Sequence, residues 1–185
     1  MKNKRHVVLG MLAIAAVAFL VFGSHVQGQS NSSPRMQLGG GFIGSGNGVI
    51  FDALQVPLDP GGRKAALHLK VHTLSPALAG LVASFGADAL TESTGEVEMT
   101  GQDTFKVCWI AYLVKQGNPP AVQGIMVLTG DAQFTGPDSY VIYSNFDIYP
   151  AAADADKDGF PDPGTDPAYS TPAPNTNYVK RVLIP

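Results

Sequence analysis

The residues most suited to chemistry are four aspartates that lie close together in the last fifth of the chain. Asp154, Asp156, Asp158 and Asp162 fall within nine residues, and Gly159 stands where a loop around an ion must turn. Four carboxylates at this spacing repel one another, and a hard divalent cation that prefers six to eight oxygen ligands removes that repulsion. The segment therefore predicts a calcium site. An acidic, solvated linker is the alternative interpretation.

The aspartate segment is similar to known calcium loops. With Asp154 as position 1, it matches the first part of an EF-hand loop, but Thr165 stands where that loop has its bidentate glutamate, and prolines rather than helices flank it. Over residues 154–162 it more closely resembles the loops of thrombospondin type 3 repeats and dockerins. That resemblance implies one structural calcium ion, bound by the side chains of Asp154, Asp156, Asp158 and Asp162 and by the backbone carbonyl of Phe160.

The N-terminal 28 residues have the features of a secretory signal peptide. A basic start precedes an apolar run over residues 7–22, and small and polar residues follow as far as Gly28. As a helix the run would span about 24 Å, which is shorter than the roughly 30 Å hydrocarbon core of a bilayer. We expect cleavage after Gly28, a secreted or periplasmic protein, and no membrane span after cleavage.

Charge and cysteine content narrow the classes of function. The predicted cleavage removes three of twelve basic residues and none of fifteen acidic ones, so the formal net charge changes from −3 to −6. This balance argues against nucleic acid as a partner. Cys108 is the only cysteine, which excludes an intramolecular disulfide. The mature chain must be stabilised by a hydrophobic core, and about 157 residues suffice for one domain.

Composition and hydrophobic period divide the mature chain into three parts. Residues 29–48 are rich in Gly and Ser and predict a flexible leader. From residue 49 to 149 the apolar residues recur with period two, which predicts a β-domain. Residues 150–185 hold the calcium loop and a C-terminal tail or strand. The predicted strands span residues 50–56, 64–74, 95–100, 104–115, 122–129, 139–149 and 178–184.

This pattern predicts an all-β fold, an antiparallel meander that closes as a small barrel or packs as a two-sheet sandwich. Residues 95–158 resemble small secreted bacterial proteins with a lipocalin-like (calycin) barrel, through a rhythm of strand, Thr-Gly-x-Asp turn and strand. Residues 76–85 are ambiguous. Ser75, Pro76 and Gly86 fit the start and stop of a short helix, but the sequence favours a strand because Gly80 weakens a helix.

The remaining polar candidates do not form a catalytic group. His68 and His72 would lie roughly 13 Å apart on one strand, too far for a common metal ion. Glu96 and Glu98 share a strand face and cannot flank a sugar from opposite sides. Cys108 lies in an apolar strand, which predicts a buried, inert thiol.

We expect a non-enzymatic secreted β-domain that acts as a binding or surface-interaction module and carries one structural calcium ion. Its partner would be a small molecule, a glycan or a protein. The alternatives are a lipocalin-like carrier of a small apolar ligand and an extracellular hydrolase. Aromatic residues such as Trp109 and Tyr143 lie on both faces of two long strands, so one set would fill the core and the other would line a cavity or a surface.

Overall fold

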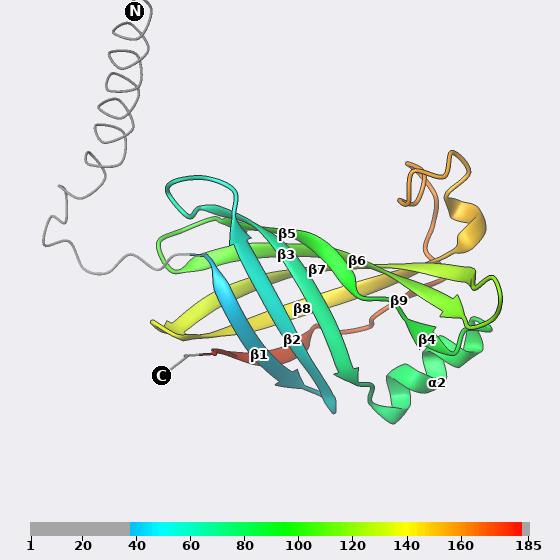
Figure 1. Ribbon diagram of the computed structural model, residues 1–185, viewed down its shortest axis with the longest axis horizontal. Coiled ribbons are helices and arrows are strands. Elements are labelled where there is room, and N and C mark those ends of the chain that lie inside the picture. The colour runs from blue at the N-terminus through cyan, green and yellow to red at the C-terminus, as the bar shows by residue number, and fades with distance from the viewer. Residues whose placement is uncertain (1–37, 183–185) are drawn as a thin grey trace, which may run out of the picture. The chain divides into compact units, whose positions relative to one another are not determined.

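The protein forms a closed antiparallel β-barrel of eight strands (Figure 1). The computed structural model describes residues 38–182. The predicted signal peptide and residues 29–37 of the predicted leader lie outside the described residues. The barrel strands are β1 (Gly40–Gly46), β2 (Val49–Pro57), β3 (Lys64–Thr73), β5 (Ser93–Met99), β6 (Thr104–Lys115), β7 (Ala121–Gly136), β8 (Ser139–Pro150) and β10 (Asn175–Arg181).

The strands follow one another around the barrel in chain order. Each pairs with the next from β1 to β8, and β10 pairs with both β8 and β1, which closes the sheet. Two short strands lie outside this ring: β4 (Ala89–Leu90) pairs with β6, and β9 (Tyr169–Ser170) pairs with β8. Of the two expected architectures the barrel is confirmed. Closure leaves the ring without an unpaired edge.

The prediction of a flexible leader is wrong for the part of it that the structure describes, because Gly40–Gly46 forms strand β1 between β2 and β10. The glycines there provide space rather than flexibility. A Cβ atom on Gly44 would collide with the ring of Phe51, which crosses over that position. The β-domain therefore begins before residue 49 and includes β10 beyond residue 149, so both ends of the described chain contribute to barrel closure.

Residues 76–85 also differ from the strand that the sequence favoured. Pro76–Ser84 forms helix α2, as the alternative interpretation predicted. The Oγ of Ser75 accepts a hydrogen bond from the N–H of Leu78 over 3.2 Å and caps the helix. Gly86 follows with φ of +77°, a value that favours glycine. The helix is stabilised by packing on the barrel, which outweighs the cost of Gly80.

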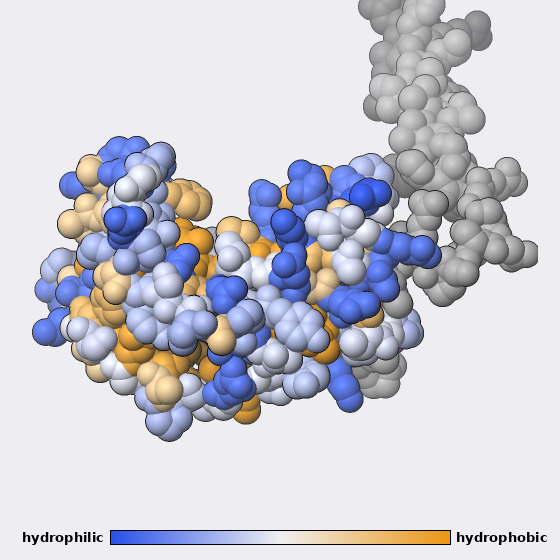
Figure 2. All heavy atoms as spheres, turned by 180° about the vertical axis from the view of Figure 1, so that it is seen from behind, coloured by the Kyte–Doolittle hydropathy of each residue, from blue (hydrophilic) through white to orange (hydrophobic). Residues whose placement is uncertain are grey.

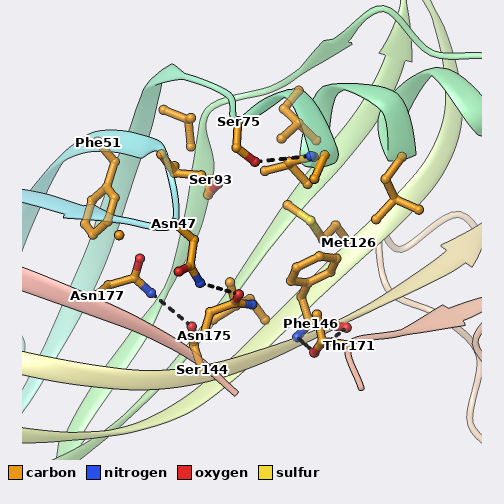
Figure 3. Close-up of a pocket in the computed structure, with 18 of the residues that line it drawn as sticks. Asn47, Phe51, Ser75, Ser93, Met126, Ser144, Phe146, Thr171, Asn175 and Asn177 are labelled. Atoms are coloured by element: carbon orange, nitrogen blue, oxygen red, sulfur yellow. Dashed lines mark hydrogen bonds between the residues drawn. The ribbon is translucent and has the colours of Figure 1, made fainter. Parts of the chain in front are cut away.

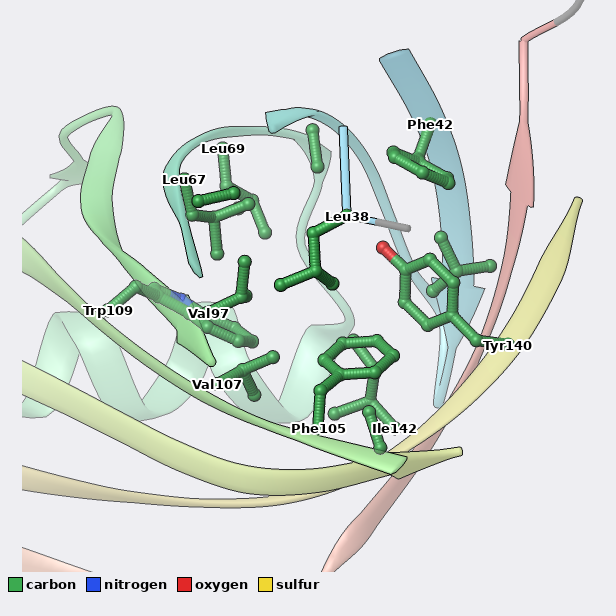
Figure 4. Packing of buried hydrophobic residues seen from close by; sticks show 14 of the residues in the cluster. Leu38, Phe42, Leu67, Leu69, Val97, Phe105, Val107, Trp109, Tyr140 and Ile142 are labelled. Carbon is green, nitrogen blue, oxygen red and sulfur yellow. The ribbon is translucent and has the colours of Figure 1, made fainter. Parts of the chain in front are cut away.

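Inward-facing side chains fill one half of the barrel (Figure 4). The ring centroid of Phe105 lies 5.1 Å from that of Tyr140 and 5.1 Å from that of Phe134. Leu38, before β1, is 2 % exposed and closes this end of the barrel. Each large apolar side chain buried in this way stabilises the fold by about 1.5–3 kcal/mol.

A second, smaller core lies between α2 and the far ends of β6, β7 and β8. Val82 of the helix is 2 % exposed and packs with buried residues of these strands, which include Leu113 and Ile148. Within residues 38–182 no helix is both long enough and apolar enough to cross a membrane. The two cores leave the lumen between them unfilled.

Candidate functional site

A cavity of about 660 Å³ occupies the barrel between the two cores (Figure 3). Its walls are inward positions of all eight barrel strands and the inner face of α2. Most of the lining is apolar; it includes Phe51, Leu69, Trp109, Met126 and Phe146. The cavity is therefore suited to a small molecule with a large apolar surface.

The cavity exists because small residues take inward positions at this level of the barrel. Gly46, Ser93 and Ser144 lie on β1, β5 and β8, where the filled half has larger side chains such as Phe42 and Tyr140. An eight-stranded barrel is just wide enough for its side chains to fill the interior or to hold one small ligand. The half of the barrel with large inward residues is filled by its own side chains, and the half with small inward residues contains the cavity.

Polar side chains are concentrated on the wall formed by β8 and β10. The amide Nδ2 of Asn177 donates a hydrogen bond to Ser144 Oγ over 3.3 Å, and Ser144 is 1 % exposed. Nearby, Asn47 Nδ2 donates to Asn175 Oδ1 over 2.7 Å and joins the β1–β2 turn to β10. Figure 3 shows these two hydrogen-bonded pairs on the same side of the cavity.

Ser93 is the buried polar residue of the opposite wall. It is 2 % exposed on β5, and its hydroxyl makes no hydrogen bond to any other residue in the described range 38–182. Buried polar groups in proteins nearly always have a partner. This hydroxyl is therefore a group that a ligand in the cavity can satisfy.

Among the described residues that line the cavity there is no aspartate, glutamate, histidine, lysine or arginine. Its polar side-chain groups are amides and hydroxyls, together with the phenol of Tyr169 and the indole N–H of Trp109. The lining therefore offers hydrogen bonds and apolar contact, and no carboxylate or imidazole for proton transfer.

The exposed residues of the lining mark where the cavity opens. Ala77 and Ser84 lie on α2, Asn47 lies in the β1–β2 turn, and Pro172 lies in the loop before β10. These three elements surround the mouth. Side chains of α2 are therefore placed to control access.

The aspartate loop, residues 154–162, contributes no residue to this lining. Carboxylate oxygens of Asp154, Asp156 and Asp158 lie within 4.8 Å of one another. Asp154 Oδ2 accepts a hydrogen bond from the N–H of Gly159 over 3.1 Å, whereas Asp154 Oδ1 is buried and has no partner among the described residues. The structure thus brings together three of the four predicted aspartate ligands.

The other two predicted ligands have different surroundings. Asp162 lies outside the trio, and its Oδ2 accepts a hydrogen bond from the N–H of Ala155 over 3.1 Å. Phe160 is 57 % exposed and its N–H donates to Asp158 Oδ1 over 2.8 Å. In Figure 2 the loop projects at the upper left and carries hydrophilic residues.

The two histidines lie on the outer face of β3, each with its own acidic partner. His68 Nε2 lies 3.1 Å from Glu92 Oε2, and His72 contacts Asp52. Lys70 Nζ is 3.3 Å from the other oxygen of Glu92, and its hydrogen bond and charge, followed by those of His68, hold the pKa of Glu92 below its ordinary value. Each histidine is therefore paired with a different carboxylate.

The glutamates and the cysteine lie in a shallow outer groove of about 410 Å³. Glu96 and Glu98 face outward on β5, where Glu98 pairs with Lys64 over 3.2 Å. The prediction of a buried thiol is wrong: Cys108 is exposed, because β6 turns its odd-numbered residues inward and this position outward. Partial desolvation, and then the charge of Glu96, raise the pKa of Cys108, so its thiolate form is disfavoured.

The fold and the cavity together define an antiparallel barrel of eight strands with an internal apolar site, an architecture consistent with the expected lipocalin-like barrel. No family model matches the chain, and neither a curated protein nor a solved structure is detectably similar to it. The site is therefore interpreted from its own geometry.

Sequence reasoning did not single out Ser93, Ser144 and Asn177. Ser144 stands between Ile142 and Phe146 in the inward positions of β8. In the sequence, a cavity residue of this kind is visible only as a small polar residue among large apolar ones at alternate positions. Such a residue can be recognised only when it is known which face of the strand points into the barrel.

Proposed function

We propose that the protein is a non-enzymatic carrier or binding module that holds a small, largely apolar molecule in the barrel cavity. The observation that supports this function is the cavity of about 660 Å³ with its apolar lining. Binding sites for small molecules typically have volumes of about 300–1,000 Å³ and a few placed polar groups. Of the functions expected from the sequence, the carrier is the one this cavity favours.

Hydrophobic transfer would provide most of the affinity. A ligand gains roughly 25 cal/mol for each Å² of apolar surface that it removes from water, less the cost of its lost freedom. Ser144, Asn177 and Ser93 would then orient it. In keeping with the predicted signal peptide, we propose that the protein binds this ligand after export, as a secreted or periplasmic protein.

A structural calcium ion in the aspartate loop remains part of the proposal. It is supported by the three carboxylates of Asp154, Asp156 and Asp158, whose oxygens lie within 4.8 Å of one another, and by the unpartnered Oδ1 of Asp154. Hard oxygen donors of this kind suit calcium. The ion would stabilise the loop on the outer wall and would take no part in contacts with the ligand.

The carrier function is tested by titrating the purified protein with N-phenyl-1-naphthylamine, an uncharged apolar fluorophore whose emission rises in an apolar site. Saturable binding of one molecule per chain is expected. Ala77→Phe places a ring at the mouth of the cavity and should weaken binding strongly, whereas Ala83→Phe introduces the same ring at an exposed position of α2 outside the lining. Absence of saturable binding, or equal loss in both variants, would refute the carrier function.

A further inference from the structure

Two buried hydroxyls face the cavity with hydrogens that no described residue accepts. Ser93 is 2 % exposed and Ser144 is 1 % exposed, and both line the cavity. Ser144 Oγ accepts a hydrogen bond from Asn177 Nδ2 over 3.3 Å, so its own hydrogen is directed elsewhere. The side chain of Ser93 makes no hydrogen bond within residues 38–182. Both hydroxyls are therefore donors available to an occupant.

The lining carries no compensating charge for an ionised ligand. Among the described lining residues there is no lysine, arginine, histidine, aspartate or glutamate. Bringing a carboxylate or an ammonium group into such a site removes its hydration without an opposite charge in return. An ionised group would have to remain at the mouth, in water, whereas an uncharged oxygen can enter.

We infer that the ligand is an uncharged amphipathic molecule whose apolar body fills the cavity and whose hydroxyl, carbonyl or ester oxygen accepts a hydrogen bond from Ser93 or Ser144. This inference rests on the proposed carrier function and adds the chemical class of the ligand. The two serines lie on β5 and β8, so hydroxyl donors reach the cavity from two different strands of its wall.

The charge requirement is tested by displacing bound N-phenyl-1-naphthylamine with decan-1-ol and with decanoic acid. At about pH 4 the acid is mostly uncharged and at about pH 8 it is ionised. The affinity of decanoic acid should fall at least about tenfold between these pH values, whereas that of decan-1-ol should stay constant. An equal or higher affinity for ionised decanoate at the higher pH, with decan-1-ol unchanged, would overturn the inference.

The role of the serines is tested in the double variant Ser93→Ala/Ser144→Ala. Loss of both donors should weaken binding of decan-1-ol by about two- to tenfold while the affinity for the fluorophore stays the same. Ser45→Ala, the same substitution at an exposed outward position of β1, is the matched control and should change neither affinity. Unchanged binding of decan-1-ol in the double variant would contradict the assignment.

These outcomes separate the two proposals. If the fluorophore does not bind the unmodified protein, the carrier function itself fails. If it binds and Ala77→Phe blocks it, but decanoate competes as well as decan-1-ol, the carrier function stands and the inference about an uncharged ligand fails. Thermal melts of each variant report whether the fold is retained.

Discussion

The phenol of Tyr112 donates a hydrogen bond to the carbonyl oxygen of Gly159 over 3.1 Å and so joins the outer wall of the barrel to the aspartate loop. Tyr112 lies on β6 and pairs with Ile125 of β7, which is 1 % exposed. Ala153, at the start of the loop, is also buried, at 5 % exposed. The loop is thus packed against the barrel and is not a free linker.

The contact between Tyr112 and Gly159 predicts that alanine is more destabilising at Gly159 than at Gly164. Gly159 and Gly164 both have positive φ, at +93° and +84°, so alanine at either costs about 1–2 kcal/mol. A Cβ on Gly159 would also lie 2.6 Å from the Tyr112 hydroxyl, whereas a Cβ on Gly164 meets nothing within 4 Å. Gly159→Ala should therefore lower the free energy of unfolding more than Gly164→Ala, as measured by urea denaturation. Equal losses would show that the Tyr112 contact adds nothing.

The proposed calcium site predicts a chelator-sensitive melting temperature. At calcium concentrations one to ten times Kd, binding would add about 0.4–1.4 kcal/mol, or about 1–6 °C. Asp156→Asn removes one carboxylate of the trio and should abolish this shift, whereas Asp166→Asn changes an exposed aspartate outside it and should preserve the shift. The shift is measured as the difference in melting temperature with and without chelator. Identical curves for the unmodified protein would refute the site.

Trp109 predicts a direct optical signal for occupancy of the cavity. It is the only tryptophan of the chain, is 7 % exposed and lines the cavity. Bound N-phenyl-1-naphthylamine absorbs where tryptophan emits, so Trp109 emission should fall as probe emission rises. Trp109→Phe should remove this energy transfer while direct excitation still reports binding. A bound probe that leaves Trp109 emission unchanged would lie outside the cavity.

Tyr140 predicts a loss of stability at high pH. Its hydroxyl accepts a hydrogen bond from Gln55 Nε2 over 3.3 Å, and burial raises its pKa well above the ordinary value, opposed only by the charge of Arg181. Above about pH 10 the unfolded chain releases the phenol proton and the folded chain retains it, so the free energy of unfolding falls as pH rises. Tyr140→Phe should reduce that slope in urea denaturation at alkaline pH. It should also cost about 1–3 kcal/mol at neutral pH because Gln55 loses its acceptor.

The sequence predicted the long strands well and the closing strands poorly, for a physical reason. Alternation of Leu67, Leu69 and Val71 with His68 and Lys70 marks a strand with one buried face, and β3 has that pattern. Strand β1 has the sequence GGFIGSG, in which the glycines hide the alternation. Its place in the barrel depends on pairing with β2 and β10, which are distant contacts that periodicity does not encode.

The site was predictable only in part. The aspartates of the loop are neighbours in sequence, so their spacing was visible at once. The cavity depends on Ser93, Ser144 and Trp109, which come from strands far apart in the chain. Ser75 and Pro76 are local signals for the start of helix α2, but the low helix propensity of Gly80 led to the prediction of a strand. Packing on the barrel stabilises the helix in spite of Gly80.

Gly44 and Phe51 supply a last prediction, because the ring of Phe51 occupies the space where a side chain of residue 44 would lie. Gly44→Ala should lower the free energy of unfolding by about 1–3 kcal/mol through overpacking, as measured by urea denaturation. Gly41→Ala lies on the same strand, and its Cβ would meet nothing within 4 Å, so it should be neutral or slightly stabilising. Phe51→Leu removes part of the ring and should make Gly44→Ala less costly in the double variant. A loss that is the same in both backgrounds would place the strain elsewhere.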